Sequence, residues 1–156
     1  MKLIKVEANQ KELLFNLFQK MLYEMTQFYD NPIYEKGIIH YGYFDEYFTD
    51  PKRIAYFIYQ DNTLVGFLMI HPYSYFDYPV DYNLAEFTIF PQYRRRGYAL
   101  DSMAQLFEMH QGTWEIKFNT KNTKAQNLWL KITKPYNPLI IQYDEYEKVL
   151  RFKVGE

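Results

Sequence analysis

Residues 84–99 read Leu84-Ala85-Glu86-Phe87-Thr88-Ile89-Phe90-Pro91-Gln92-Tyr93-Arg94-Arg95-Arg96-Gly97-Tyr98-Ala99. A β-rich run stops at Pro91, three arginines follow, and Gly97 precedes an apolar helical pattern. A helix N-terminus presents unpaired N–H groups and the positive end of the helix dipole, and glycine lets the backbone approach a ligand closely. This order of strand, basic loop and helix predicts a cradle for a diphosphate.

The segments before this stretch predict an antiparallel region with one long helix. Asn9 and Glu12 form the pattern of a capping box, and the helix that they open is expected to end near Asp30-Asn31-Pro32. The dipeptide Asp61-Asn62 joins two β-rich runs in the manner of a hairpin turn. The expected elements are a strand over residues 2–7, the helix, a short helix at Phe44–Phe48, and strands at Arg53–Gln60 and Thr63–Ile70.

The segments after it predict alternating strands and helices. The expected elements are a strand at Tyr82–Phe90, a helix from Gly97 to Gly112, a strand at Trp114–Thr120, a helix from Asn122 to Ile132, and closing strands at Leu139–Tyr143 and Lys148–Val154. An antiparallel front followed by a parallel βαβ unit indicates an α+β (mixed α/β) fold with one mixed sheet. At 156 residues, a single domain over residues 1–156 is expected.

Composition narrows the classes of function. The chain has no cysteine, which excludes disulfides, thiolate metal sites and a cysteine nucleophile. His40, His71 and His110 lack metal-ligand spacing, so no metal is expected. The formal net charge is −1 and no apolar run approaches the length of a membrane span. We therefore expect no nucleic-acid partner and no membrane partner, and a soluble, cytoplasmic protein.

The charge differs between the two parts of the chain, and aromatic residues are abundant. Residues 1–90 carry 7 basic and 12 acidic side chains, whereas residues 91–156 carry 11 and 7. This asymmetry is consistent with a cationic substrate at the front and an anionic cofactor at the back, or with ordinary surface scatter. Aromatic residues make up 21 % of the chain, which suits a binding pocket or an oligomer contact.

Two motifs carry a resemblance to a known family. Arg94-x-x-Gly97-x-Ala99 matches the pattern [Q/R]-x-x-G-x-[G/A], and Asn122-Thr123-Lys124-Ala125-Gln126-Asn127-Leu128-Trp129 resembles N-x-x-A-x-x-[FL]-[YW]. In this setting of strand and helix the chain resembles the GNAT N-acetyltransferases. The resemblance implies acetyl-CoA as cosubstrate and a central mixed sheet of six to seven strands, splayed between strands four and five and flanked by about four helices.

The resemblance also implies roles for individual residues. The backbone of Thr88, Ile89 and Phe90 would pair with the pantetheine arm, and the Ile89 N–H would polarise the thioester carbonyl. The remaining residues implied in cofactor binding lie in two segments. The arginine loop and the helix start after it contribute Arg94, Arg95, Arg96, Gly97, Tyr98 and Ala99, and the helix that begins at Asn122, here called the Asn helix, contributes Asn122, Ala125 and Trp129.

Glu86 is the candidate general base. A lysine-like amine has a pKa of about 10.4, so removing its proton costs roughly 4.6 kcal/mol at pH 7. Many relatives place a proton-donating tyrosine where this chain has Trp129, and tryptophan cannot act as that acid. Tyr98 and Tyr136 are the alternative donors. Glu86 has a simpler alternative as the ion-pair partner of an arginine.

Other functions remain open at this stage. They are a GNAT domain that binds acetyl-CoA without catalysis, an unrelated phosphate-binding module, and an interaction protein with an aromatic surface. The acceptor site is expected from residues 20–50, residues 71–81 and the C-terminal strands. Its aromatic and acidic character favours a cationic small-molecule or peptide amine with an apolar portion, and the arginines favour an anionic acceptor. A homodimer is also compatible with the resemblance.

Overall fold

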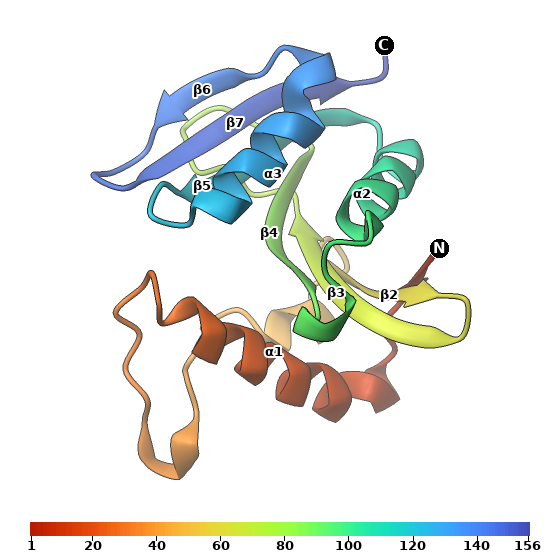
Figure 1. Ribbon diagram of the computed structural model, residues 1–156, viewed down its shortest axis with the longest axis vertical. Coiled ribbons are helices and arrows are strands. Elements are labelled where there is room, and N and C mark those ends of the chain that lie inside the picture. Colours follow the sequence, from red (N-terminus) through yellow and green to blue (C-terminus); the bar gives the residue numbers. More distant parts are fainter.

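One seven-stranded sheet organises the molecule, and the computed structural model describes all of residues 1–156. The strands lie in the order β1-β2-β3-β4-β5-β7-β6 (Figure 1). All neighbouring pairs are antiparallel except β4 and β5, which are parallel. The strands are β1 (Lys2–Lys5), β2 (Ile54–Gln60), β3 (Thr63–His71), β4 (Tyr82–Ile89), β5 (Gly112–Asn119), β6 (Leu139–Gln142) and β7 (Glu147–Val154). The predicted mixed sheet is confirmed.

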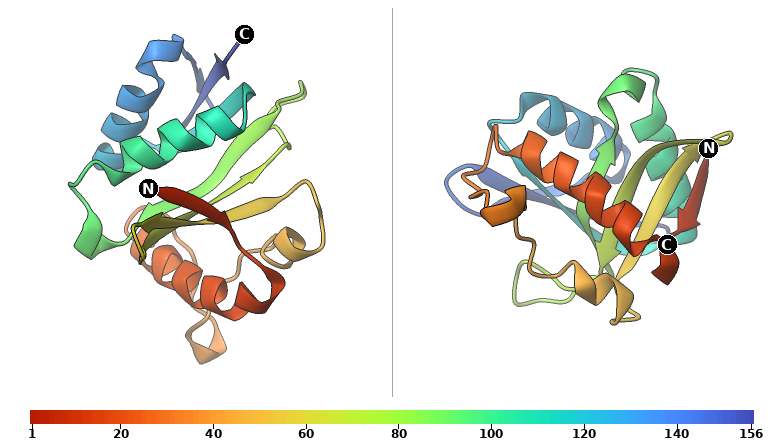
Figure 2. Two further views of the ribbon diagram at one scale, coloured as in Figure 1. Left: turned by 90° about the vertical axis from the view of Figure 1, so that its right-hand side faces the viewer. Right: turned by 90° about the horizontal axis from the view of Figure 1, so that it is seen from below.

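Three α-helices cover the two faces of this sheet, where about four were expected. Helix α1 (Lys11–Met25) lies on one face, and α2 (Tyr98–Met109) and α3 (Thr123–Thr133) lie on the other (Figure 2). Five short 3-10 segments complete the helical structure, one of them at Asp45–Phe48, where the sequence predicts a short helix. No helix is long and apolar enough to cross a membrane.

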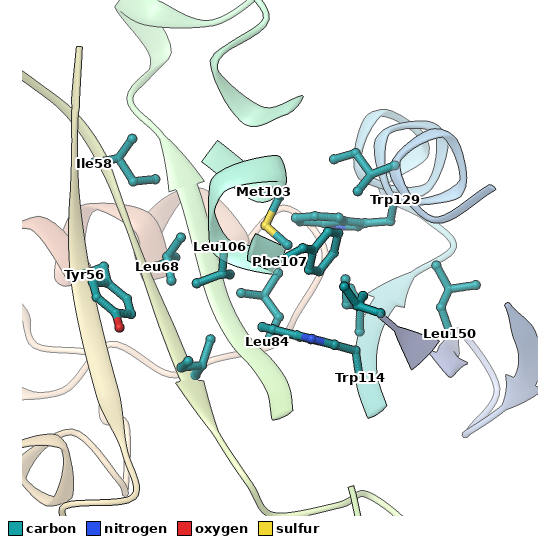
Figure 3. Packing of buried hydrophobic residues seen from close by; sticks show 14 of the residues in the cluster. Tyr56, Ile58, Leu68, Leu84, Met103, Leu106, Phe107, Trp114, Trp129 and Leu150 are labelled. Carbon is teal, nitrogen blue, oxygen red and sulfur yellow. The ribbon is translucent and has the colours of Figure 1, made fainter. Parts of the chain in front are cut away.

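Successive side chains of each strand point to opposite faces of the sheet, so the buried residues form two cores. In β2, Ala55 and Phe57 pack under α1, whereas Tyr56 and Ile58 face α2 and α3. The larger core lies between the sheet, α2 and α3 (Figure 3). Its labelled members are Tyr56, Ile58, Leu68, Leu84, Met103, Leu106, Phe107, Trp114, Trp129 and Leu150.

The ends of α1 differ from expectation. The capping box forms between Glu7 and Gln10, with the Glu7 N–H donating to the Gln10 side chain over 3.0 Å, and it opens a 3-10 turn that leads into α1. Helix α1 ends at Met25, five residues early, because polar side chains take its last carbonyls: Thr26 Oγ1 donates to the Tyr23 carbonyl over 2.6 Å. The residues after Met25 are thereby free to turn toward the sheet.

Strands β4 and β5 separate after a short paired region. They pair only where Tyr82–Leu84 meets Trp114–Ile116, whereas β5 continues beside β7 over its whole length. Glu86 pairs with Met69 and Leu84 pairs with Ile70, so Ala85 is an extra residue in β4. A bulge of this kind bends the strand that carries it. The predicted splay between the fourth and fifth strands is therefore confirmed, and the bulge marks where it begins.

Candidate active site

The splayed edge of β4 presents backbone groups that β5 does not pair. The Phe90 N–H donates to the Val65 carbonyl over 2.8 Å, which directs it toward β3. Backbone groups alternate in direction along a strand, so the Ile89 N–H points away from β3, into the space where β5 has separated. The Ile89 N–H therefore has no partner in either neighbouring strand.

The N–H groups of the two neighbours of Ile89 point the other way, toward β3. Thr88 lies two residues before Phe90, so by the same alternation its N–H faces β3. Both backbone groups of Phe90 are already engaged, because its carbonyl accepts from the Tyr93 N–H over 2.9 Å. Of these three residues, only Ile89 presents an N–H to the space between β4 and β5.

The loop after β4 offers a run of free N–H groups. No acceptor in the chain meets the backbone N–H groups of Arg95, Arg96 and Gly97, nor those of the first helical residues 98–100. Arg95 has φ of 63° and Gly97 has φ of 81°, and such left-handed turns direct successive N–H groups toward one point. A diphosphate such as that of coenzyme A fits this arrangement in charge and in hydrogen bonding.

Arg94 is placed differently from its two neighbours. Its guanidinium forms two 2.7 Å hydrogen bonds to the Glu24 carboxylate on α1, and its Nε donates to the Ile89 carbonyl over 2.7 Å. The hydrogen bond from Arg94 holds the pKa of Glu24 below its usual range. The Arg94 side chain thus joins α1 to the end of β4, and its part in cofactor binding stays a prediction. Arg95 and Arg96 remain exposed.

The Asn helix lies along the larger core. Asn122 Oδ1 accepts the Ala125 N–H over 3.1 Å, so its predicted capping role is confirmed, and no acceptor meets its Nδ2. Ala125 is partly buried against the larger core. Trp129 is 7 % exposed and meets the Phe87 ring edge-on at 5.2 Å between centroids. Its indole also points toward Met103 and Phe107 in Figure 3.

The two alternative tyrosines lie in different parts of the structure. Tyr136 stacks on Phe152 at 5.6 Å between centroids, and Phe152 pairs with Trp114 at the end of the sheet remote from Ile89. Tyr98 begins α2, and its ring packs against the larger core. Of the two, Tyr136 is thus remote from Ile89.

Glu86 points to the α1 side of the sheet, because its ladder partner Met69 belongs to the core beneath α1. The side chain keeps some solvent-accessible surface, yet burial raises its pKa to about 8. The charge of Lys117 and a hydrogen bond from Tyr41 act in the opposite direction. No arginine or lysine forms a salt bridge with Glu86, which excludes the alternative of an arginine ion pair.

Tyrosines from distant parts of the chain lie near this carboxyl group. Burial is the main cause that raises their pKa values, and the charge of Glu86 adds to it in each case. They come from the region after α1, from residues 41–47 and from the loop before β4, and are Tyr29, Tyr41, Tyr47 and Tyr75. These are the segments in which the acceptor site was expected.

A buried ion pair holds the loop before β4 in place. Glu115 is 0 % exposed and accepts from Ser74 Oγ at 2.9 and 3.0 Å, from the Tyr75 N–H at 3.0 Å and from Arg151 Nη1 at 2.8 Å. Arg151 also donates to the Pro79 carbonyl over 2.6 Å. Sequence reasoning missed this pair, because its members are far apart in sequence and no motif contains them.

Two surface cavities lie elsewhere. One of about 430 Å³ is lined by residues that include Phe15 and Phe44, and another of about 330 Å³ by residues that include Gln19 and Tyr23. Neither contains Glu86, Ile89 or the free N–H groups of the arginine loop. No group of three or more His, Asp or Glu side chains is arranged to hold a metal ion. Glu86, Ile89 and the free N–H groups therefore lie along β4 and the loop after it, and not at these cavities.

Comparison with known proteins agrees with this arrangement. Residues 15–133 match the model of the acetyltransferase (GNAT) family. No protein of curated function matches significantly. A GNAT-family acetyltransferase from Streptococcus agalactiae has a similar structure, with a TM-score of 0.72, 16 % identity, and 99 % of this chain and 95 % of that chain covered.

Two further solved structures have functional names. A spermidine N-acetyltransferase chimera containing the Vibrio cholerae protein gives a TM-score of 0.60 at 14 % identity, covering 99 % of this chain and 96 % of that chain. The Campylobacter jejuni N-acetyltransferase PseH gives 0.56 at 13 % identity, covering 99 % and 98 %. At these identities the likeness concerns the fold, whereas the family model covers most of the chain. The chain therefore belongs to the GNAT acetyltransferase family.

Proposed function

We propose that this chain, acting as a single domain, transfers an acetyl group from acetyl-CoA to a primary amine of a small molecule or peptide, in a ternary complex without a metal. One observation carries the proposal. The arginine loop with free N–H groups leads directly from the strand that bears the free Ile89 N–H and the carboxyl group of Glu86. A site for a diphosphate, a donor for an acyl oxygen and a base thus lie along one continuous segment.

The cofactor side is built mainly from backbone groups. Acetyl-CoA, when bound, supplies an acyl carbon activated as a thioester. The N–H groups of residues 95–99 are assigned to the pyrophosphate, with Arg95 and Arg96 adding favourable charge. Asn122 Nδ2 is free to bind the pantetheine arm. The Ile89 N–H is the donor assigned to the acyl oxygen, since fixed donors stabilise the charge that develops there.

Glu86 accepts the proton that the attacking amine loses. A base works best when its pKa lies near the working pH, and burial brings that of Glu86 to about 8. The N–C bond forms as the C–S bond breaks, and the amine proton passes to Glu86. Trp129 offers no hydroxyl at the place of the family's tyrosine, so the leaving thiolate, with a reference pKa of about 8.5, departs without a proton from that helix.

The tyrosines around Glu86 indicate the acceptor's character. A cationic amine is attracted by a carboxylate and by the faces of aromatic rings. The same rings would cover an apolar portion beside the amine. We therefore assign a cationic primary amine with an apolar portion as the acceptor, rather than an anionic molecule.

An acetyl-transfer assay over a panel of amines tests the proposed function. The panel contains simple alkylamines, amino acids, a polyamine, an aminoglycoside and a lysine peptide, and the readouts are CoA release and a 42 Da increase in acceptor mass. Wild-type protein is expected to acetylate at least one amine, and Glu86→Gln is expected to lose most of that activity. Full activity of Glu86→Gln across pH would remove Glu86 from the mechanism.

A second candidate function is binding of acetyl-CoA without catalysis, which the burial of Trp129 at the tyrosine position favours. In that case acetyl-CoA would bind normally while no amine in the panel gained mass.

A further inference from the structure

Lys117 on β5 lies close to the point where β4 and β5 separate. Its neighbours Ile116 and Phe118 belong to the core beneath α2 and α3, so Lys117 points to the opposite face, the side to which Glu86 also points. The Lys117 Nζ lies 3.5 Å from the Glu147 carboxylate, and the Lys117 side chain is only 26 % exposed. Lys117 on β5 and Glu86 on β4 therefore lie on opposite sides of the gap where these two strands separate.

Two aromatic rings complete the surroundings of this ammonium group. It lies 4.6 Å from the centroid of the Tyr75 ring and 4.9 Å from that of Tyr143. The Glu147 carboxylate also accepts from the Tyr29 hydroxyl over 2.8 Å. One carboxylate and two ring faces form a site of the kind that binds an organic cation. In this chain the occupant is a lysine of the protein itself.

Two other carboxylates near these rings, Glu115 and Asp144, are already engaged. Glu115 accepts from Ser74, the Tyr75 N–H and Arg151. Asp144 accepts the backbone N–H groups of Tyr146 and Glu147 over 3.0 and 2.8 Å. When the reacting amine of an acceptor occupies Glu86, a second ammonium group would therefore meet the Lys117 charge without a further free carboxylate to pair with. A group that is neutral or anionic at the same place would meet no such repulsion.

We propose that Lys117 is a specificity-determining residue that fills the cation site beside Glu86 and thereby selects acceptors with a single positive charge over diamines and polyamines. This inference rests on the proposed function, because it concerns the acceptor of the same reaction. It predicts that removal of the Lys117 ammonium opens the site formed by Glu147, Tyr75 and Tyr143 to a second cationic group of the acceptor.

The test compares two acceptors of equal size. Hexylamine and 1,5-diaminopentane have the same number of heavy atoms and differ in a terminal methyl or ammonium group. Wild-type protein is expected to show a kcat/KM for hexylamine at least tenfold above that for the diamine at pH 8. In Lys117→Met, which keeps the chain length without the charge, this ratio is expected to fall by about tenfold to a hundredfold, as for a newly formed charged hydrogen bond.

Lys153→Met is the matched control. Lys153 lies on β7, on the same face of the sheet as Lys117 but exposed, and it pairs with Thr113 at the other end of β5. This variant is expected to keep the wild-type ratio, and Lys117→Gln is expected to reproduce the change seen in Lys117→Met. The inference is overturned if wild-type protein prefers the diamine, or if Lys117→Met keeps the wild-type ratio.

A binding measurement separates the inference from the proposed function. If no amine is acetylated, the proposed function fails, and calorimetric titration of 1,5-diaminopentane into the CoA-saturated protein decides the inference. Lys117→Met is expected to bind the diamine at least tenfold more tightly than wild-type protein. Equal affinities would overturn the role of Lys117 whatever the catalytic result.

Discussion

The arginine loop after β4 presents backbone groups of consecutive residues, whereas the space in front of Glu86 is surrounded by side chains from distant segments. The loop needs Gly97 at a φ of 81° and free N–H groups, and both requirements are met within a few neighbouring positions. The acceptor side brings Tyr29, Tyr41 and Tyr75 together only after folding. A cofactor site made of backbone groups would therefore leave a local motif in the sequence, whereas an acceptor site made of side chains from distant segments would leave none.

The largest expected effect tests whether the acceptor side at Glu86 and the cofactor side at the arginine loop act separately. Glu86→Gln removes the base but keeps the size of the side chain, so kcat is expected to fall by about 10²- to 10⁴-fold. The affinity for acetyl-CoA, measured by calorimetry, is expected to remain within about twofold, because Glu86 lies on the acceptor side. A large loss of acetyl-CoA affinity in this variant would show that the two sides are not separate.

The same carboxyl group predicts a pH dependence. In wild-type protein, kcat/KM is expected to rise with pH through about 8, since Glu86 must be ionised to accept a proton and burial raises its pKa to that value. The raised pKa also means that the folded state binds this proton more tightly than the unfolded chain. Its contribution to stability is full at low pH and is lost as pH rises through about 8. Both trends are expected to be absent from Glu86→Gln.

Glu115→Ala tests whether the acceptor side depends on its buried ion pair. Removing this carboxylate leaves Arg151, Ser74 Oγ and the Tyr75 N–H without their acceptor, and breaking a buried pair costs about 3–5 kcal/mol. We expect a loss of this size in the free energy of unfolding, measured by urea titration. The exposed Glu145→Ala is the control and is expected to change stability by less than about 0.5 kcal/mol.

Two glycine variants sharpen the claim that the cofactor side depends on backbone conformation. A Cβ at Gly97 or at Gly42 would meet no atom within 4 Å, but only Gly97 has a positive φ. Gly97→Ala is expected to weaken CoA binding by roughly tenfold, because alanine in this conformation costs about 1–2 kcal/mol. Gly42→Ala is expected to leave CoA binding unchanged. Equal effects of the two substitutions would contradict a conformational role for Gly97.

The smallest expected effect is a difference in CoA affinity between Arg94→Met and the same substitution at Arg95 or Arg96. The Arg94 side chain pairs with Glu24 and is 40 % exposed, so Arg94→Met is expected to cost about 1 kcal/mol of stability at most and to leave CoA affinity nearly unchanged. Arg95→Met and Arg96→Met are expected to weaken CoA binding several-fold at low salt and less at high salt. Calorimetric titration of CoA into the three variants at low and at high salt measures these affinities.

Local chemistry explains what the sequence could predict. Pro91, Gly97 and Asn122 act on the backbone of their own neighbourhood, so the strand end, the loop and the cap of α3 were all predictable from short motifs. The bulge at Ala85 was not predictable, because Ala85 has no side-chain property that marks it and the register depends on β3. The same reason applies to the ion pair of Glu115 and Arg151, which depends on the pairing of β5 with β7.

Thermal unfolding with and without acetyl-CoA tests the central claim, that the splay and the arginine loop form an acetyl-CoA site. A ligand that binds only the folded state stabilises it by about 2.7 kcal/mol at a hundredfold excess over its dissociation constant. We expect acetyl-CoA and CoA to raise the midpoint of unfolding, and ATP and NAD to have no comparable effect. An unchanged midpoint at millimolar acetyl-CoA would contradict the account.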